Sequence, residues 1–300
     1  MIAGRTDAGT DGIGPQGAHE DMLKTGLVGR AILASRSPWL HEQEARAQGL
    51  ELTYELFDFT QTGQADGDLE SLLRQLSRAG YSGVNVTYPF KQAVIPLLDE
   101  LADCARTVGA VNTVAMRDGR LVGYNTDKTG FEESLAENMP GVRLDKVLQL
   151  GAGGAGAAVA NALLSLGTRE LVVADVDLAR AEDLAGRLNA ACATGTVVAQ
   201  LSQAVETETV AGIVNTTPMG MAAHPEPAID PRLIASHHWV ADIVYFPLET
   251  QLLHLAREKG CKTMNGSGMV IGQAARAFQI FTGKAANKAR MAESFLAKSA

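Results

Sequence analysis

The chain has 300 residues, enough for one large or two medium domains, and 46% of them are hydrophobic, so a sizeable core can form. A net charge of −8 and a pI near 5.3 argue against nucleic-acid binding, which needs a clustered basic surface. Three widely spaced cysteines, Cys104, Cys192 and Cys261, predict small buried thiols, with neither a disulfide framework nor a metal site.

The first segment, Met1–Lys24, is rich in Gly, Asp and Thr and has no hydrophobic signal core. We expect it to be a mobile leader or an extension outside the fold. The chain has no apolar run of about 18 residues, so we predict no membrane span and no membrane partner. From these absences we expect a cytoplasmic protein.

The first half of the chain predicts an alternation of strands and helices. The expected strands, with β-branched or alternating apolar residues, are Leu27–Ala34, Leu52–Phe59, Gly83–Thr87, Ala110–Met116 and Leu121–Asn125. The expected helices are Trp39–Gly49, Leu69–Arg78, one from near Phe90 to near Gly109, and Gly130–Asn138. Pro96 lies in the first turns of the third helix or splits a short turn from it. Asp118-Gly119 between two strands predicts a hairpin.

From Lys146 onward, a regular strand–helix alternation predicts a doubly wound, Rossmann-type dinucleotide-binding domain. The expected strands are Val147–Leu150, Glu170–Ala174, Thr196–Gln200, Ile213–Thr216, Trp239–Val244 and Cys261–Met264. The expected helices are one opening at Gly151–Gly156, then Leu178–Leu188, Glu249–Lys259, Met269–Phe281 and Ala285–Lys298. We expect the last two helices to pack back across a cleft onto the first domain.

A glycine-rich turn between a strand and a helix predicts the cofactor site. Gly151-x-Gly153-Gly154-Ala155-Gly156 is a variant of the dinucleotide fingerprint, in which glycines allow a tight turn and a close approach of the pyrophosphate. The N–H groups that open the helix would bind that pyrophosphate.

Asp175 lies 24 positions beyond Gly151 (175 − 151), near the spacing expected for a carboxylate that accepts from the adenosine ribose. Asp175 and Asp177 would repel the 2′-phosphate of NADP, and Arg180 alone makes a poor phosphate pocket. The sequence therefore predicts NAD, with NADP as the less favoured cofactor. The alternative is that Asp175 only caps the following helix.

Polar patches follow several expected strands of the first half, where ligands bind in open α/β sheets. They are Ser35-Arg36-Ser37-Pro38, Asn85-Val86-Thr87 with Lys91, Gly109 to Thr113, and Asn125-Thr126-Asp127. Each patch has a structural alternative. Lys91 could be a solvated residue at the end of a strand, Ser35 and Ser37 could be turn or cap residues, and Asn112 and Asn125 could cap the hairpin.

These patches, in this order, closely resemble the shikimate dehydrogenase family, including its NAD-using quinate/shikimate branch. The resemblance continues through Gly151–Gly156, Asn215-Thr-Thr-Pro-Met-Gly220, Asp242-Ile-Val-Tyr245 and Gly266-Ser-Gly268-Met269 with Gln273. It implies a reversible, NAD(P)-linked oxidation of a cyclic hydroxy acid. It also implies a substrate domain (25–126 with 269–300) and a Rossmann domain (127–268), with the active site in the cleft between them.

The resemblance assigns roles to individual residues. Lys91 and Asp127 would be the catalytic pair, with Lys91 as the proton carrier and Asp127 as its orienting partner. The implied substrate contacts are Ser35, Ser37, Thr87, Asn112, Tyr245 and Gln273, although Tyr245 could also be a core aromatic. The implied cofactor contacts are Gly151, Gly153, Gly154, Ala155, Asp175, Arg180, Thr217, Met219, Val244, Gly268 and Met269. We expect Ser37 to tune the choice between shikimate and quinate.

NADP-using members of the family carry an Asn-Arg-Thr segment where this chain has Asp175-Val176-Asp177, which again favours NAD. The expected activity is an NAD-dependent shikimate or quinate dehydrogenase. The alternatives are an NADP-dependent biosynthetic shikimate dehydrogenase and a non-catalytic dinucleotide sensor. The expected partner is a small molecule, and a homodimer is an open alternative for the assembly. No histidine lies in these motifs, and we expect His237 and His238 to face solvent.

Overall fold

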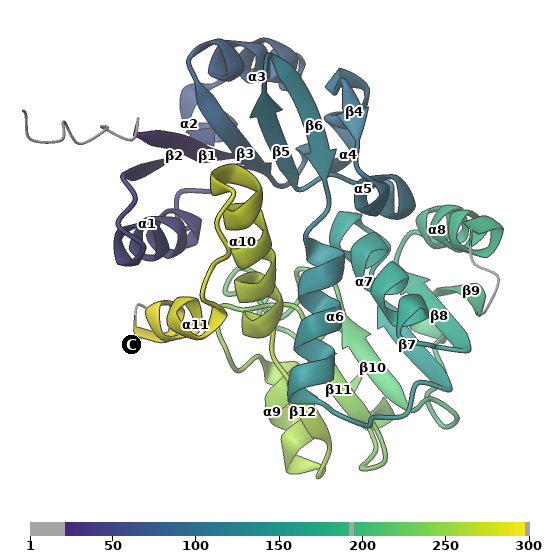
Figure 1. Cartoon of the computed structure of the whole chain (residues 1–300). Helices are drawn as coiled ribbons and strands as arrows, with labels where there is room; N and C mark the ends of the chain where they lie inside the picture. The colour runs from purple at the N-terminus through teal and green to yellow at the C-terminus, as the bar shows by residue number, and fades with distance from the viewer. Residues whose placement is uncertain (1–21, 192–194, 298–300) are drawn as a thin grey trace, which may run out of the picture.

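The computed structural model describes residues 22–191 and 195–297 (Figure 1). Its first sheet has the strand order β2-β1-β3-β5-β6-β4. These strands are β1 (Leu23–Gly29), β2 (Leu52–Asp58), β3 (Tyr81–Val86), β4 (Glu100–Leu101), β5 (Thr113–Arg117) and β6 (Arg120–Tyr124). The helices between them are α1 (Ser37–Ala47), α2 (Phe59–Thr62), α3 (Leu69–Arg78), α4 (Phe90–Ala93) and α5 (Asp103–Val108). The three strands β1, β2 and β3 are parallel, and β5 and β6 form the predicted antiparallel hairpin.

The second sheet has the order β12-β11-β10-β7-β8-β9, and all its neighbouring strands are parallel. Its strands are β7 (Lys146–Leu150), β8 (Glu170–Asp175), β9 (Thr196–Leu201), β10 (Gly212–Asn215), β11 (Trp239–Asp242) and β12 (Lys262–Met264). The helices of this part are α6 (Asp127–Asn138), α7 (Gly154–Ser165), α8 (Leu178–Ala191) and α9 (Gln251–Glu258). This strand order is that of doubly wound dinucleotide-binding sheets, so the predicted fold class is confirmed.

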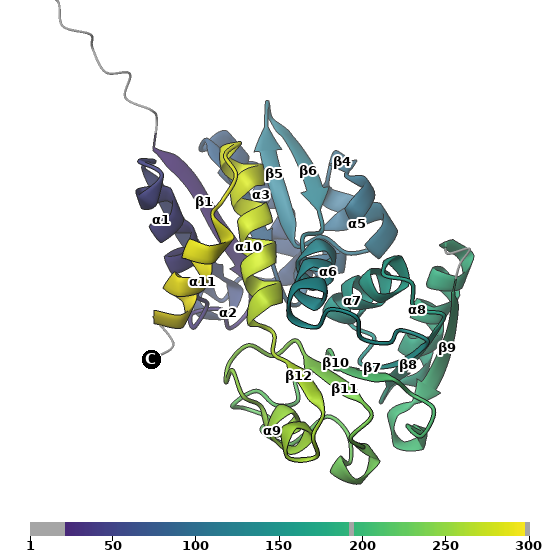
Figure 2. The same cartoon turned by 60° about the horizontal axis from the view of Figure 1, so that its bottom comes forward.

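The two C-terminal helices, α10 (Ser267–Thr282) and α11 (Lys288–Ala297), return to the first sheet, as predicted. Helix α10 lies alongside α6, between the two sheets (Figures 1 and 2). The ring of Phe281 packs so closely on Gly83 of β3 that a Cβ there would lie 2.6 Å from it. Arg290 of α11 donates two hydrogen bonds, of 2.8 and 2.7 Å, to the buried Glu44 of α1. The C-terminal helices are thus fixed to the first domain.

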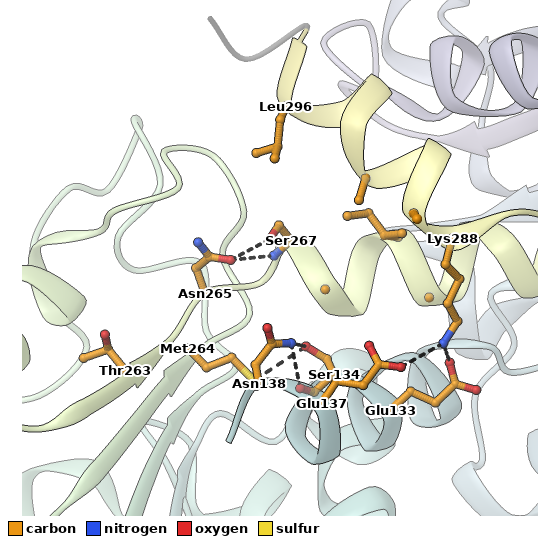
Figure 3. Close-up of a pocket in the computed structure, with 15 residues that line it drawn as sticks. Glu133, Ser134, Glu137, Asn138, Thr263, Met264, Asn265, Ser267, Lys288 and Leu296 are labelled. Atoms are coloured by element: carbon orange, nitrogen blue, oxygen red, sulfur yellow. Dashed lines mark hydrogen bonds and ion pairs between the residues drawn. The ribbon is translucent and has the colours of Figure 1, made fainter. Parts of the chain in front are cut away.

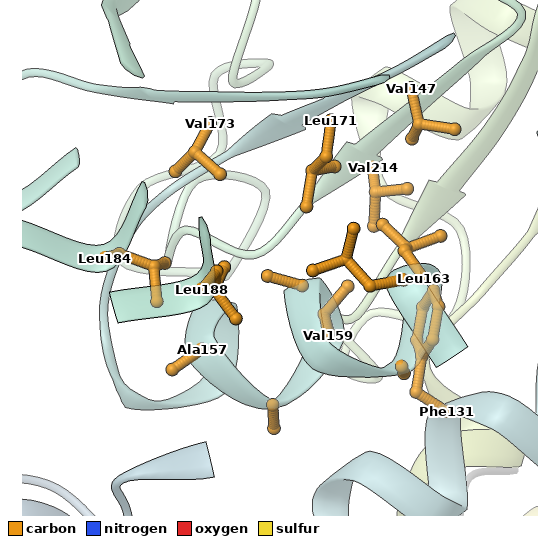
Figure 4. Packing of buried hydrophobic residues seen from close by; sticks show 14 of the residues in the cluster. Phe131, Val147, Ala157, Val159, Leu163, Leu171, Val173, Leu184, Leu188 and Val214 are labelled. Atoms are coloured by element: carbon orange, nitrogen blue, oxygen red, sulfur yellow. The ribbon is translucent and has the colours of Figure 1, made fainter. Parts of the chain in front are cut away.

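The core of the second domain forms between α7 and the face of the sheet (Figure 4). Val159 and Leu163 of α7 pack with Leu171 and Val214 of the strands, and all four are fully buried. Gly156 lets α7 begin close to the end of β7, because a Cβ at this position would lie 2.4 Å from the carbonyl oxygen of Gly151. The glycine-rich turn is therefore held firmly against the carboxyl end of the sheet. No helix in the described part of the chain is long and apolar enough to cross a bilayer.

The first strand lies several residues before its predicted position. Leu23 and Lys24 already pair with β2, so the leader expected through Lys24 is two residues too long, and Met1–Asp21 lies outside the described residues. The strand ends at Gly29 because the next backbone groups find another partner. The N–H groups of Ala31 and Ile32 donate to the Asp58 carboxylate at 3.0 and 2.8 Å.

The single helix predicted from near Phe90 to near Gly109 is wrong. The segment forms α4, a 3₁₀ turn at Ile95–Leu97, the short edge strand β4, and α5. Pro96 lies in the 3₁₀ turn and cannot donate to a helical hydrogen bond. Asp99 then binds Leu121 through both backbone and side chain, at 2.9 and 2.7 Å, which directs the chain onto β6. Long-range pairing has overridden the helical pattern.

The prediction that His238 faces solvent is also wrong, whereas His237 is exposed. His238 is 2% exposed, its Nδ1 accepts from the Ala235 N–H at 3.0 Å, and its Nε2 lies 3.0 Å from the Thr207 carbonyl oxygen. Burial lowers the pKa of His238, so the ring is held neutral. Cys261 is buried as predicted, Cys104 is half-buried, and Cys192 lies outside the described residues.

A second buried histidine, His41 of α1, makes the stability of the fold sensitive to acid. Both ring nitrogens lack a hydrogen-bond partner, and burial lowers the pKa of His41 to about 3. The unfolded chain binds a proton here below about pH 6.5, so stability is full above that value and falls as the pH drops toward 3. We expect His41→Leu to remove about 2 kcal/mol of the loss in unfolding free energy between pH 7 and pH 5, measured by urea denaturation.

The matched control is His237→Leu, which removes an exposed histidine and should keep the wild-type pH dependence. An equal loss of stability in the wild type and in His41→Leu would show that His41 does not titrate on unfolding.

Candidate active site

The structure places Lys91 against Asp127. Lys91 lies on α4, directly after β3, and Asp127 is the first residue of α6. The Lys91 Nζ is 2.6 Å from the Asp127 Oδ2, and the two side chains are 20% and 8% exposed. The neighbouring Phe90 is buried edge-to-face against Phe59, which fixes α4 on the sheet. Lys91 is therefore a paired, largely buried residue and not a solvated lysine.

The pair borders a cavity of about 180 Å³ between the two domains. This volume is smaller than that of pockets for drug-sized ligands, roughly 300–1,000 Å³, so the cavity suits a molecule smaller than a typical drug. The cavity contains all the predicted catalytic and substrate residues: Ser35, Ser37, Thr87, Lys91, Asn112, Asp127, Tyr245 and Gln273. The sequence patches, which are far apart along the chain, thus meet in one place.

Asn112 connects the hairpin to the C-terminal helix. Its Oδ1 accepts from the Thr126 N–H at 2.9 Å, and its Nδ2 lies 3.4 Å from the Gln273 Oε1 of α10. Asn112 therefore bonds to the backbone that follows the hairpin and also lines the cavity. Asn125 has only the structural role, because it bonds the Ala110 carbonyl and the Lys128 N–H, at 3.0 and 3.2 Å.

The two serines, Ser35 and Ser37, take part in the local turn before α1 and also line the cavity. The Ser35 Oγ accepts from the Ser37 N–H at 3.3 Å, and Ser37 begins α1. Tyr245 is 37% exposed at the same cavity, with its ring centroid 6.2 Å from that of Phe295. It is therefore not a core aromatic.

A second cavity of about 760 Å³ adjoins the first and shares Thr87, Lys91 and Ala155 with it. The glycine-rich turn lines this second cavity. Gly151 has a φ of +102°, a left-handed conformation that favours glycine, and a Cβ at Gly153 would meet open space. The first-turn N–H groups of α7 have no partner within the helix. The turn can therefore receive a pyrophosphate, and these residues fit a dinucleotide.

Asp175 ends β8 beside this turn. Its Oδ2 accepts from the Ala152 N–H at 2.7 Å and its Oδ1 from the Asp177 N–H at 3.0 Å. The cap of α8 is instead Asp177, whose Oδ1 accepts from the Ala179 N–H at 3.1 Å. The helix-cap alternative for Asp175 is thus wrong.

Two arginines of α8, Arg180 and Arg187, line the second cavity. Each is paired with an acid on its own helix or cap, Arg180 with Asp177 at 3.3 Å and Arg187 with Asp183 at 3.0 Å.

The predicted cofactor residues Thr217, Met219 and Val244 lie on the loops after β10 and β11. Asn215 holds the first loop, because its side chain bonds the Thr217 hydroxyl at 2.7 Å and the Met219 carbonyl at 2.9 Å. The buried Asp242 accepts from Asn215 at 2.9 Å and from the Val244 N–H at 3.0 Å. Asn215 and Asp242 were missed as positioning residues, although both end strands inside the quoted motifs.

Gly268 and Met269 are neighbours that line different cavities. Met269 contributes to the substrate cavity, whereas Gly268 lies against Ser134 of α6, where a Cβ would be 2.3 Å from the Ser134 Oγ. Gly268 lines a third cavity of about 640 Å³ between α6, α10 and α11, with Lys288 paired to Glu133 and Glu137 at its edge (Figure 3). Gly268 therefore lines a different cavity from the two that meet at Lys91. The predicted cofactor residues that line neither of those two cavities also include Gly151, Asp175, Thr217, Met219 and Val244.

Several residues that line these two cavities were given no role in the prediction, although Asn85 was among the polar residues expected at a strand end. Asn85 and Val270 line the substrate cavity, and Tyr88, Gln92 and Arg187 line the glycine-rich one. The position of Asn85, two residues before Thr87 in the predicted strand Gly83–Thr87, was a signal for its role, because alternate residues share one face of a strand.

Two family models match the chain. The model described as the shikimate dehydrogenase substrate binding domain matches residues 27–114. The model described as the shikimate 5′-dehydrogenase C-terminal domain matches residues 266–294.

The relatives include proteins named for either cofactor. The chain is 47% identical to a shikimate dehydrogenase (NADP(+)) of Pseudarthrobacter chlorophenolicus, over 90% of this chain and 93% of the relative. It is 46% identical to a quinate/shikimate dehydrogenase (NAD(+)) of Corynebacterium efficiens, over 93% and 99% of the two chains. A solved quinate dehydrogenase from Corynebacterium glutamicum, in complex with NAD, superposes with a TM-score of 0.86 at 43% identity. That match covers 92% of this chain and 99% of the other.

Proposed function

The chain belongs to the shikimate dehydrogenase family, and from this premise we propose that it catalyses the reversible, NAD-dependent oxidation of quinate or shikimate at a ring hydroxyl. Members of the family are NAD(P)-dependent oxidoreductases that act on a CH–OH group. The observation that carries the proposal is the position of the Lys91–Asp127 pair, at the border between the 180 Å³ cavity and the glycine-rich cavity.

The pair supplies the proton chemistry. A bound nicotinamide accepts or gives the hydride, and a protein group must move the hydroxyl proton. In oxidation Lys91 Nζ would accept that proton as a neutral amine, and in reduction the ammonium would return it. Asp127, at the N-terminus of α6, holds the ammonium at 2.6 Å and so orients it toward the hydroxyl. Because Lys91 lines both cavities, it can exchange a proton with the hydroxyl oxygen whose carbon gives up or receives the hydride.

The remaining cavity residues orient the ring. Asn112, just before β5, and Gln273 of α10 lie 3.4 Å apart and supply amide donors and acceptors for ring hydroxyls. Serine hydroxyls at Ser35 and Ser37 bind the carboxyl end of the substrate without adding charge. Tyr245 covers the same cavity from the second domain.

The charges around the glycine-rich cavity support NAD over NADP. Asp175 is next to the turn and can accept from the ribose hydroxyls, as in other dinucleotide-binding domains. Arg180 and Arg187, which could attract a 2′-phosphate, are each paired with an aspartate. The net balance near the ribose is therefore unfavourable for an additional phosphate.

Initial rates with quinate and shikimate, each with NAD and NADP, test the proposal. We expect turnover of at least one of the two acids and a higher kcat/KM with NAD than with NADP for the better one. The reason is that the carboxylate of Asp175 binds the ribose hydroxyls of NAD and repels the phosphate of NADP.

A clear preference for NADP would support the alternative, an NADP-dependent shikimate dehydrogenase. Binding of NAD without turnover of either acid would support a dinucleotide sensor. The presence of Lys91 and Asp127 argues against a sensor, which has no use for a proton carrier. We also propose the domain division 25–126 with 269–300, and 127–268, with the first domain extended to Leu23, where β1 begins.

A further inference from the structure

A fully buried amide, Gln149, lies on β7 two residues before the glycine-rich turn begins. β7 pairs with both β8 and β10, so it lies inside the sheet. Its residues Val147, Leu148 and Leu150 are buried and apolar. Burying an amide among such residues lowers stability unless new hydrogen bonds replace those that it made with water. The partners of Gln149 therefore indicate why an amide lies at this position.

The amide nitrogen of Gln149 joins the two ends of the glycine-rich turn. Its Nε2 donates to the carbonyl oxygens of Gly151 and Gly156, at 2.9 Å in each case. Carbonyl oxygens can only accept, so the atom between them must be the amide nitrogen, and both of its hydrogens are used. A Cβ at Gly156 would lie 3.1 Å from this nitrogen, so the amide packs directly on the turn. One side chain thus holds the first and last residues of the turn together.

Neither carbonyl depends on Gln149 for a hydrogen-bond partner. The Thr216 hydroxyl, which lies 2.7 Å from the Leu150 carbonyl oxygen, is also 3.0 Å from that of Gly151. The Gly156 carbonyl lies inside α7 and has a regular helical donor four residues later. The Oε1 of Gln149 is itself buried and has no partner among the described residues. Because an unsatisfied buried acceptor lowers stability, Gln149 is a poor choice for the fold alone.

The middle of the turn keeps its donors for a ligand. The N–H groups of Gly151 and Ala152 are used by the Ala174 carbonyl and the Asp175 carboxylate, both at 2.7 Å. The first-turn N–H groups of α7, which begins at Gly154, have no partner within the helix. Their directions depend on how the two ends of the turn are held, because a glycine-rich backbone has many accessible conformations.

We propose that Gln149 is a positioning residue of the cofactor site. By fixing the separation of Gly151 and Gly156, it keeps the N–H groups between them in the arrangement that binds a pyrophosphate. The dinucleotide then binds without first having to order the turn, which raises its affinity. The unsatisfied Oε1 is the cost of this arrangement to the stability of the fold. The inference rests on the proposed function for its ligand and adds a residue that acts on that ligand through the backbone.

The test is Gln149→Met, which keeps the length of the side chain and removes both polar atoms. We expect the Kd for NADH, measured by calorimetry, to rise about tenfold, because the hydrogen bonds that order the turn are lost. The Kd for NADPH should rise by the same factor, since the two cofactors share the pyrophosphate. The free energy of unfolding without cofactor, measured with urea, should equal or exceed that of the wild type. An unchanged Kd for NADH would overturn the inference.

Two further readouts separate positioning of the turn from a general structural role. In steady-state kinetics the KM for the cofactor should rise, whereas kcat and the KM for the acid should stay close to the wild-type values. In competition with NAD, the inhibition constant of ADP should rise about tenfold and that of adenosine, which has no pyrophosphate, should not change. Equal losses for ADP and adenosine would contradict the inference.

The matched control is Asn161→Leu. Asn161 is a buried amide of α7 whose nitrogen donates to the Ala157 carbonyl of the same helix at 2.9 Å, and it lines neither the substrate cavity nor the glycine-rich one. This variant should keep the wild-type Kd for NADH. An equal loss of affinity in Asn161→Leu would mean that any change in the packing of α7 has the same effect.

Gln149→Leu is a second variant in case Met does not fit the site, and it should give the same loss of NADH affinity. If neither variant folds, the inference is wrong, because Gln149 would then be required for the fold. Calorimetry measures binding alone. A lack of turnover with both acids would therefore overturn the proposed function and leave this test intact.

Discussion

Replacing Lys91 by Ala is expected to lower kcat by about 10²–10⁴-fold, with a smaller effect on KM. Lys91 is the one described basic side chain that lines both functional cavities, so it is placed to exchange a proton with the hydroxyl whose carbon gives up the hydride. The substitution also leaves Asp127, 8% exposed, without its counter-ion. The measurement is steady-state kinetics with the better of the two acids.

Two further variants separate proton transfer from charge. Lys91→Arg keeps a positive charge beside Asp127 but cannot release a proton near neutral pH, so its kcat should remain low. Lys128→Ala is the matched control, because Lys128 forms a 2.6 Å ion pair with Glu132 on the same helix as Asp127 and lines neither cavity. It should keep wild-type turnover. Turnover of Lys91→Ala within a few-fold of the parent would contradict its role as the proton carrier.

Replacing Asp175 by Asn is expected to lower the ratio of kcat/KM for NAD to that for NADP by about a hundredfold. The single amide oxygen of Asn can still accept from the Ala152 N–H and hold the glycine-rich turn, while the Asp177 N–H loses its acceptor. The negative charge is lost, however. Hydrogen bonds from the ribose of NAD become weaker, and the repulsion of the phosphate of NADP is relieved.

The comparison variant for this prediction is Asp177→Asn. Asp177 caps α8 and pairs with Arg180, and Asn retains the capping ability. We expect a smaller change of the cofactor ratio here. Equal changes in both variants would show that the charge at the start of α8, and not contact with the ribose, sets the cofactor. An unchanged ratio in Asp175→Asn would remove Asp175 from cofactor choice altogether.

The elements predicted well are those whose patterns are local. The glycine-rich turn, the Asp-Gly hairpin and the parallel second sheet were all found, because tight turns and buried strands leave marks in a few consecutive residues. The errors arose where a hydrogen-bond partner far away in the sequence determined the local secondary structure. Asp58 ends β1 by binding the N–H groups of Ala31 and Ile32, and Asp99 turns an apolar run into an edge strand beside β6.

The sequence by itself determined the chemistry available at the site: a lysine, an aspartate, serines, amides and a glycine-rich turn, each at the end of a strand. It also determined the negative charge beside the glycine-rich turn, since Asp175 and Asp177 directly follow the expected strand Glu170–Ala174. Only the tertiary structure decided which hydrogen bonds these groups make, because their partners come from other strands and helices. The Lys91–Asp127 contact and the hydrogen bond between Tyr54 and Asn85 both depend on such distant neighbours.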